Sequence, residues 1–152
     1  MKYSLFFLLF LAFGFTACST YSEKELNEFD QKIAAYVKKQ PIPFEKSESG
    51  LYYHIERVGE GENFIKLTDK VTFTYEGKLL NGKVFDSTSV GKPAVFNVNR
   101  LIAGWQEIFM NLKKGGKATI VVPPQLGYGD HSLPNLPKNS ILVFNLEVLN
   151  VE

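Results

Sequence analysis

Apolar residues between positions 22 and 39 recur every three or four residues, which is the spacing of an amphipathic helix. Ser22 and Glu25 have the spacing of a capping box, in which each side chain bonds the other residue's backbone N–H. Pro41 and Pro43 should end this helix, because proline disfavours helical geometry at and before its own position. The apolar stripe consists of Leu26, Phe29, Ile33, Tyr36 and Val37. We expect it to pack against the rest of the chain, the alternative being a second copy.

After Gly50 the apolar pattern changes to the two-residue period of β-strands. Val71, Phe73 and Tyr75 alternate with polar residues and should share one face of a sheet. The Asn81-Gly82 pair is a strong signal for a tight turn between two of the strands. Strands are expected at residues 51–58, 70–80, 83–87, 94–98, 117–123 and 140–151.

One helical stretch, centred on Trp105, interrupts the strands. Its apolar residues are Leu101, Ile102, Trp105, Ile108, Phe109 and Leu112. Gly115-Gly116 is expected to end it, since glycine commonly terminates helices. Gly104 beside the tryptophan should allow close packing. A mostly antiparallel sheet with this short helix across it is an α+β domain. Taken alone, a single tryptophan on a helix is more often part of the core than of a binding site.

The first 18 residues have the layout of a secretory signal: Lys2, an apolar run from Leu5 to Phe15, and small residues before Cys18. The apolar run is too short to span a bilayer. Small residues directly before a cysteine resemble the lipobox of bacterial lipoproteins, although Phe15 stands where leucine is usual. Cys18 is the only cysteine, so no intramolecular disulfide can form. We expect residues 1–17 to be a lipoprotein signal peptide and Cys18 to be lipidated. A plain secretory signal that leaves a free thiol is the alternative.

The charge balance and the polar residues exclude several classes of function. Removing residues 1–17 takes away Lys2 and no acid, which leaves 16 basic and 16 acidic residues. A neutral chain gives no indication of nucleic-acid binding. His54 and His131 lie far apart, without a cluster of cysteines or carboxylates, so no metal site is expected. No serine or cysteine has the setting of a nucleophile, and no glycine-rich loop matches a phosphate site. An enzyme of this sequence would work without a cofactor or a covalent intermediate.

Three segments in order, "VTFTYEGKLLNGKVFDSTSVGKPAVFNV", "LIAGWQEIFMNLKKGGKATIVVPPQLGYG" and "LPKNSILVFNLEVLNV", resemble FKBP-type peptidyl-prolyl isomerases. The resemblance covers residues 50–152. It implies a five- to six-stranded antiparallel sheet wrapped around one short helix, with an apolar pocket between them. The expected organisation is therefore a signal peptide at 1–17, a lipidated N-terminal helix and linker at 18–49, and an isomerase domain at 50–152.

The resemblance also implies which residues form the site. Asp86, the Tyr128 hydroxyl and the backbone N–H of Ile102 would contact substrate carbonyl groups and act in catalysis. Trp105 would be the floor beneath the bound proline ring. The other substrate-binding residues would be Tyr75, Phe85, Phe96, Leu101, Leu136 and Phe144. Without the resemblance, most of these aromatic residues would be read as core, whereas a turn cap is only the minor alternative for Asp86.

The implied function is catalysis of X–Pro bond rotation in secreted or envelope proteins, by a lipid-anchored, periplasm-facing folding factor without a cofactor. Ala94 and Val90 stand where related proteins often carry an aromatic and a basic residue. These changes predict weaker binding of the family's macrolide inhibitors and a modest rate. They also favour the main alternative, an anchored module that binds proline-containing partners with little catalysis, for example in motility machinery. A purely structural lipoprotein would need neither Asp86 nor Tyr128. The short N-terminal helix favours a monomer.

Overall fold

The computed structural model describes residues 20–152, and the predicted signal peptide and Cys18 lie outside the described residues. Within this part of the chain are two α-helices, α1 and α2, two short 3₁₀ turns, and seven strands. The helices are α1, Glu23–Val37, and α2, Ala103–Phe109; the 3₁₀ turns are Val98–Arg100 and Pro124–Leu126. The strands are β1, Glu45–Lys46; β2, Tyr52–Arg57; β3, Lys70–Leu79; β4, Val84–Ser87; β5, Ala94–Asn97; β6, Lys117–Val122; and β7, Leu142–Val151.

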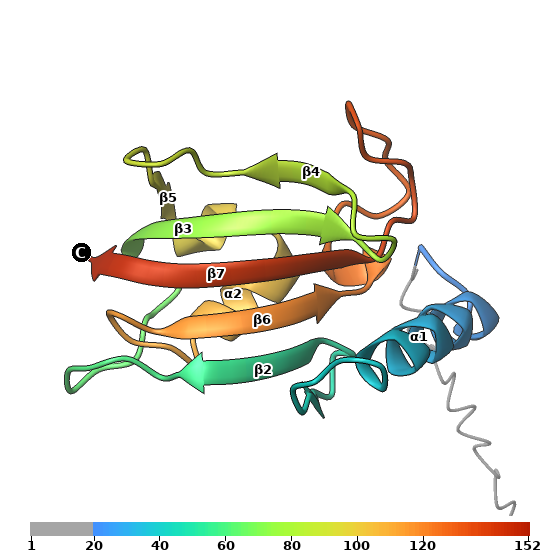
Figure 1. Ribbon diagram of the computed structural model, residues 1–152, viewed down its shortest axis with the longest axis horizontal. Coiled ribbons are helices and arrows are strands. Elements are labelled where there is room, and N and C mark those ends of the chain that lie inside the picture. Colours follow the sequence, from blue (N-terminus) through green and yellow to red (C-terminus); the bar gives the residue numbers. More distant parts are fainter. Residues whose placement is uncertain (1–19) are drawn as a thin grey trace, which may run out of the picture.

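All strands belong to one antiparallel sheet, in the order β1-β2-β6-β7-β3-β4, with β5 also paired to β3 (Figure 1). The antiparallel α+β fold predicted from the sequence is confirmed. The predicted count of five to six strands is too low, because seven are formed within the described residues. The additional strand is β1, which lies in the segment expected to be a linker. It pairs with β2.

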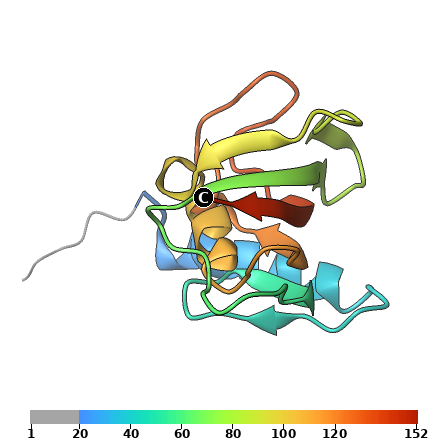
Figure 2. The ribbon, with the colours of Figure 1, turned by 90° about the vertical axis from the view of Figure 1, so that its left-hand side faces the viewer.

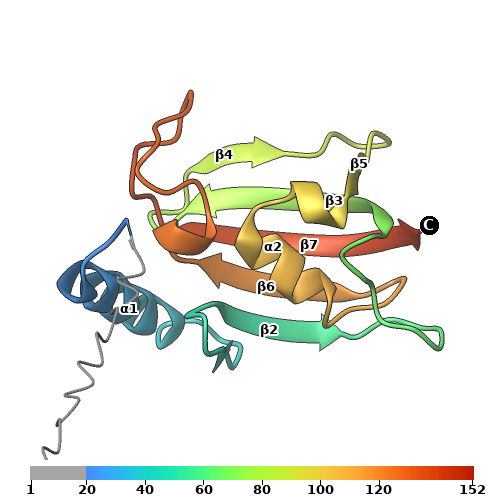
Figure 3. The same ribbon diagram turned by 180° about the vertical axis from the view of Figure 1, so that it is seen from behind.

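Helix α2 lies across one face of the sheet and forms the main core there (Figure 3). Val71 and Phe73 are fully buried against it and Tyr75 is half-buried, as their alternation predicts. The sheet twists beside the helix, as seen along the strands in Figure 2. Burial of this continuous apolar cluster is the main stabilising contribution to the domain.

Helix α2 is shorter than the sequence predicts. It ends at Phe109, well before the expected stop at Gly115-Gly116. Leu112 is still fully buried, which is why the apolar pattern extends beyond the helix. The Lys113 N–H donates to the carbonyl of Val58 at 2.8 Å, so the backbone turns away from the helix to pair with the chain after β2.

Gly104 allows α2 to approach the sheet closely, as predicted. A Cβ atom at this position would lie 2.9 Å from Cγ1 of Val122 and 3.4 Å from Cδ1 of Leu51. Both of these side chains are fully buried and have little room to move. The close packing of the helix that carries Trp105 therefore depends on the absence of a side chain at Gly104.

Gly104→Ala is expected to lower the free energy of unfolding by about 1–3 kcal/mol, the usual cost of overpacking a core. Alanine would otherwise stabilise a helix by roughly 1 kcal/mol over glycine, so the sign of the change is informative. Urea unfolding followed by circular dichroism measures it. The double variant with Val122→Ala should recover part of the loss, because the contact is removed. An unchanged or raised stability of Gly104→Ala would contradict this packing.

Helix α1 packs against the opposite face of the sheet, at one end of the strands (Figure 1). The predicted capping box is formed: Ser22 N–H donates to Glu25 Oε2 at 2.8 Å, and Glu25 N–H donates to Ser22 Oγ at 3.3 Å. Phe29 and Ile33 are buried against strand residues whose side chains point away from α2. Together they form a second hydrophobic cluster, whose buried residues are Tyr21, Phe29, Ile33, Tyr52, Val121, Ile141 and Val143. The stripe of α1 is thus covered by the chain's own domain.

Candidate active site

Trp105 is enclosed by aromatic rings that stand nearly perpendicular to its indole plane. The ring centroids of Tyr75, Phe144 and Phe73 lie 4.9, 4.8 and 5.1 Å from it, at interplanar angles of 71, 81 and 83°. Edge-to-face contacts of this kind are favourable because the positive edge of one ring meets the negative face of the other. They hold Trp105 in one orientation, with 6% of its surface exposed.

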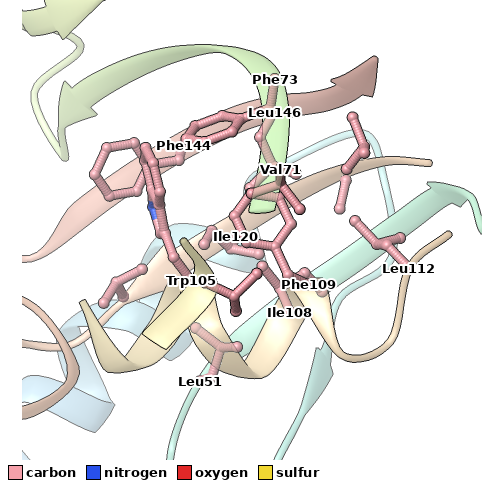
Figure 4. Close-up of a cluster of buried hydrophobic side chains, with 14 of the residues drawn as sticks. Leu51, Val71, Phe73, Trp105, Ile108, Phe109, Leu112, Ile120, Phe144 and Leu146 are labelled. Carbon is pink, nitrogen blue, oxygen red and sulfur yellow. The ribbon is translucent and has the colours of Figure 1, made fainter. Parts of the chain in front are cut away.

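Helix α2 and four strands supply this aromatic cluster. Figure 4 shows Trp105 and Phe109 rising from α2 toward Phe73 on β3 and Phe144 on β7. Phe85 on β4 extends the cluster at one side, 5.7 Å from Phe144. Phe96 on β5 extends it at the other side, 6.5 Å from Phe73, and is half exposed. The aromatic substrate-binding residues that the resemblance assigned to a pocket, Tyr75, Phe85, Phe96, Trp105 and Phe144, therefore lie in one connected group.

Gly77 on β3 is needed for the contact between Phe85 and Phe144. A Cβ atom at this position would lie 2.8 Å from Cζ of Phe85 and 2.7 Å from Cε1 of Phe144. Gly77 also pairs with Asp86 on β4 and with Phe144 on β7. The glycine thus brings both rings over the strand that carries Tyr75.

Asp86 lies at the edge of the aromatic group and is held by Tyr75. The Tyr75 hydroxyl donates to Oδ2 of Asp86 at 2.6 Å. A hydrogen bond to a charged acceptor is about twice as strong as one between neutral groups. Asp86 itself is exposed, so its carboxylate faces solvent while its orientation is fixed from the aromatic side.

The charge of Asp86 also acts on the hydroxyl of Tyr128. Burial raises the pKa of the Tyr128 hydroxyl, and the negative charge of Asp86 raises it further. The pKa of Tyr75 is raised by burial first, then by its hydrogen bond to Asp86 and by that carboxylate's charge. Among residues 20–152, no hydrogen-bond partner is found for the Tyr128 hydroxyl, and the side chain is 37% exposed. It is a protonated donor that is open to a ligand.

Raising the pH through 10 should therefore leave Tyr75 and Tyr128 protonated in the folded protein, whereas tyrosines of the unfolded chain ionise at about pH 10. Because the folded state then holds protons that the unfolded state has lost, the free energy of unfolding should fall as the pH rises above about 10. Titration of the tyrosine ¹³Cζ signals by NMR tests this, with Tyr75→Phe to assign one resonance. Ionisation of Tyr128 at or below pH 10 would contradict the described surroundings.

Ile102 stands at the start of α2, where backbone N–H groups have no partner within the helix. Its carbonyl accepts the N–H groups of Trp105 and Gln106 at 2.9 and 3.1 Å. No acceptor is found for its own N–H within residues 20–152. The Gln106 side chain donates to the carbonyl of Leu101 at 2.7 Å and fixes the segment before the helix.

Three of the predicted substrate-binding residues are buried: Phe144 is 1% exposed, Leu136 3% and Trp105 6%. Leu136 and Phe144 belong to the main core cluster and offer little surface to a ligand. The indole Nε1 of Trp105 is buried and has no hydrogen-bond partner among the described residues. Phe73 and Phe109 were predicted only as apolar residues of a strand and of the helix, yet both contact the Trp105 ring. The alternation of Phe73 with Tyr75 was the signal for this.

Comparison with known proteins decides the family. Residues 61–149 match the sequence model of the family described as FKBP-type peptidyl-prolyl cis-trans isomerase. The chain belongs to this family. An FKBP-type isomerase FkpA from Buchnera aphidicola is 41% identical over 134 residues, which are 86% of this chain and 52% of that protein. FkpA from Escherichia coli K12 is 43% identical over 107 residues, which are 70% of this chain and 39% of that protein.

Solved structures of FKBP-type proteins have the same fold. The crystal structure of E. coli FkpA superposes with a TM-score of 0.72 at 38% identity, covering 86% of this chain and 59% of that one. The crystal structure of AtFKBP13 gives 0.65 at 35% identity, covering 72% of this chain and 98% of that one. This chain thus spans about half the length or less of the curated relatives named above.

Within residues 20–152, no three acidic, histidine or cysteine side chains gather closely enough to hold a metal ion. In the same part of the chain, no helix is both long and apolar enough to cross a bilayer.

Proposed function

We propose that this protein catalyses cis–trans isomerisation of peptide bonds that precede proline in partner polypeptides. The observation that carries the proposal is the enclosed aromatic group around Trp105, bordered by Asp86 and the open donor Tyr128. Family membership supports the same activity.

The chemistry suits a site of this kind because rotation breaks no covalent bond. Amide resonance sets a barrier of roughly 18–20 kcal/mol, which makes uncatalysed exchange take tens of seconds. In the twisted transition state the amide loses resonance, and its carbonyl becomes less polar. A surface of aromatic rings disfavours the planar, polar ground state more than the twisted one. Each reduction of the barrier by about 1.4 kcal/mol raises the rate tenfold.

Three polar groups would hold the substrate in the twisted geometry. The Tyr128 hydroxyl and the Ile102 N–H, both without acceptors among the described residues, would donate to carbonyls on either side of the proline. The Asp86 carboxylate, oriented by Tyr75, would interact with the twisting carbonyl. The proline ring would rest on Trp105, between the rings of Tyr75 and Phe85. None of these residues needs to transfer a proton.

We place this activity in the cell envelope. The proposal rests on the signal-like layout of residues 1–17 and the single cysteine that follows, at position 18. Lipidation of Cys18 would anchor an α1-linked isomerase domain at a membrane surface, where it would assist folding of exported proteins. The coverage of α1 by its own domain supports a monomer. Intact-mass measurement on membrane-derived protein tests the anchor, and an unmodified Cys18 would contradict it.

One observation favours a second function, binding of proline-containing partners with little catalysis. Val90 is fully exposed and Ala94 is small, so the border of the site between β4 and β5 offers less enclosure than an aromatic or basic residue would. A more open site excludes less water. It therefore lowers the polarity around the bound amide less than an enclosed site would.

NMR exchange spectroscopy on an Ala-Leu-Pro-Phe peptide distinguishes the two functions. Accelerated cis–trans exchange with the wild-type protein, and none with buffer, establishes the isomerase. Peptide binding that quenches or shifts Trp105 fluorescence without accelerating exchange would establish the binding module. Tyr128→Phe should weaken peptide binding or slow exchange, because one donor is removed.

A further inference from the structure

A cavity of about 510 Å³, with Tyr128 in its lining, lies between the start of α1 and the turn after β6. This volume is within the roughly 300–1,000 Å³ of ligand sites. Tyr21 and Leu26 line it from the α1 side, and Pro124, Tyr128, Asp130 and His131 from the turn. Figure 3 shows the start of α1 beside the turn that follows β6.

The two walls of this cavity are tied together. The Tyr21 hydroxyl donates to Oδ1 of Asn139 at 2.8 Å, and the Asn139 N–H donates to the carbonyl of Gly129 at 2.9 Å. Tyr21 is also buried against Phe29 of α1, with ring centroids 5.3 Å apart. The helix is thus attached to the turn that carries Tyr128, so the cavity has a fixed shape.

The cavity combines an apolar wall with an acidic edge. Tyr21, Leu26 and Pro124 provide the apolar part, and Asp130 provides a carboxylate that is mostly exposed. The charges of Asp130 and Glu25 both act on Tyr21, where they add to the effect of burial in raising its pKa. None of the described residues lining the cavity is a lysine or arginine. His131 lies beside this carboxylate, with its Nδ1 3.2 Å from Oδ1 of Asp130.

We propose that this cavity is a second substrate subsite, which binds an apolar residue together with a lysine or arginine near the isomerised proline. The inference rests on the proposed function, because Tyr128 is the wall shared by the two sites. A polypeptide whose carbonyl is bound by the Tyr128 hydroxyl continues past that ring, and the cavity is the adjoining space. Its apolar wall takes a side chain such as leucine, and Asp130 attracts the basic group. The N-terminal helix thereby contributes directly to substrate choice.

Peptide titrations monitored by ¹⁵N NMR on the full domain with α1 test the subsite. The probes are Ala-Leu-Pro-Phe, the same core with Lys-Leu-Gly before it or Gly-Leu-Lys after it, and versions of both extended peptides with Glu in place of Lys. One of the two lysine peptides should bind about tenfold more tightly than the core, from one apolar contact and one ion pair. That peptide alone should shift the amide signals of Tyr21 and Leu26.

Asp130→Lys should remove most of this gain, and Asp130→Asn part of it. Glu62→Lys is the matched control, an exposed acid in the loop between β2 and β3 at the opposite end of the sheet (Figure 1), and it should keep the gain. The subsite is wrong if neither lysine peptide exceeds the core, if the glutamate versions gain equally, or if the gain survives Asp130→Lys. Failure of the proposed catalysis is separate: it would show as no accelerated exchange of the core peptide, whatever the shifts at Tyr21 and Leu26.

Discussion

Trp105→Ala is expected to lower the free energy of unfolding by roughly 3–5 kcal/mol, the range for removing a large aromatic side chain from a packed interior. The indole is 6% exposed and is in contact with rings from both α2 and the sheet. Its removal would leave a cavity that these rings cannot fill, because they are themselves fixed by strands. Urea unfolding followed by circular dichroism at 222 nm measures the loss, since the protein's single tryptophan is no longer present as a probe.

The same substitution should abolish detectable isomerase activity under conditions where the variant is still folded. Trp105→Phe separates the two effects, because it keeps an aromatic ring with a smaller volume. It should retain most of the stability and part of the activity. Met110→Ala, at the exposed end of the same helix, is the matched control and should change neither greatly. A loss of less than about 1 kcal/mol for Trp105→Ala would contradict the enclosed arrangement described here.

Most strands could be predicted because a half-buried strand alternates, as the long strand β3 does. Strand β7 alternates only after its first three residues, which are all buried. The short strand β1 could not be predicted, because its two residues are exposed and bear no pattern. The end of α2 was misjudged for a different reason. Leu112 keeps the apolar spacing of the helix, yet its neighbour Lys113 bonds to Val58, a contact between segments distant in sequence.

The site, like the fold, has features that could be predicted from the sequence and features that could not. The residues of the aromatic group could be named from the family resemblance, and Phe73 from its alternation with Tyr75. The hydrogen bond between Tyr75 and Asp86 could not be predicted from spacing, because β3 and β4 change register between Gly77 and Lys78. The attachment of Tyr21 to Asn139 joins residues 118 positions apart. Such contacts depend on how α1 is placed, which the amphipathic pattern alone does not specify.

Asp86→Ala should lower kcat/KM for a proline peptide roughly ten- to a hundredfold, the factor expected when a group that acts on the transition state is lost. Asp86 is exposed, so stability should change little. Asp86→Asn keeps an acceptor for the Tyr75 hydroxyl and removes the charge, so it should fall between wild type and Asp86→Ala. Tyr75→Phe should have a smaller effect, since the carboxylate remains but loses its orientation.

The chain offers a matched control for this experiment. The Tyr52 hydroxyl donates to Oδ1 of Asp30 at 3.0 Å under α1, on the opposite face of the sheet. Asp30→Ala removes a tyrosine–aspartate hydrogen bond of the same kind, away from Trp105, together with the ion pair between Asp30 Oδ1 and Lys46 Nζ at 2.6 Å. It should leave kcat/KM unchanged. If Asp86→Ala and Asp30→Ala lower the rate equally, the effect is one of stability. If Asp86→Ala leaves the rate at the wild-type value, the carboxylate has no part in catalysis, and the aromatic surface with Tyr128 and the Ile102 N–H must account for it.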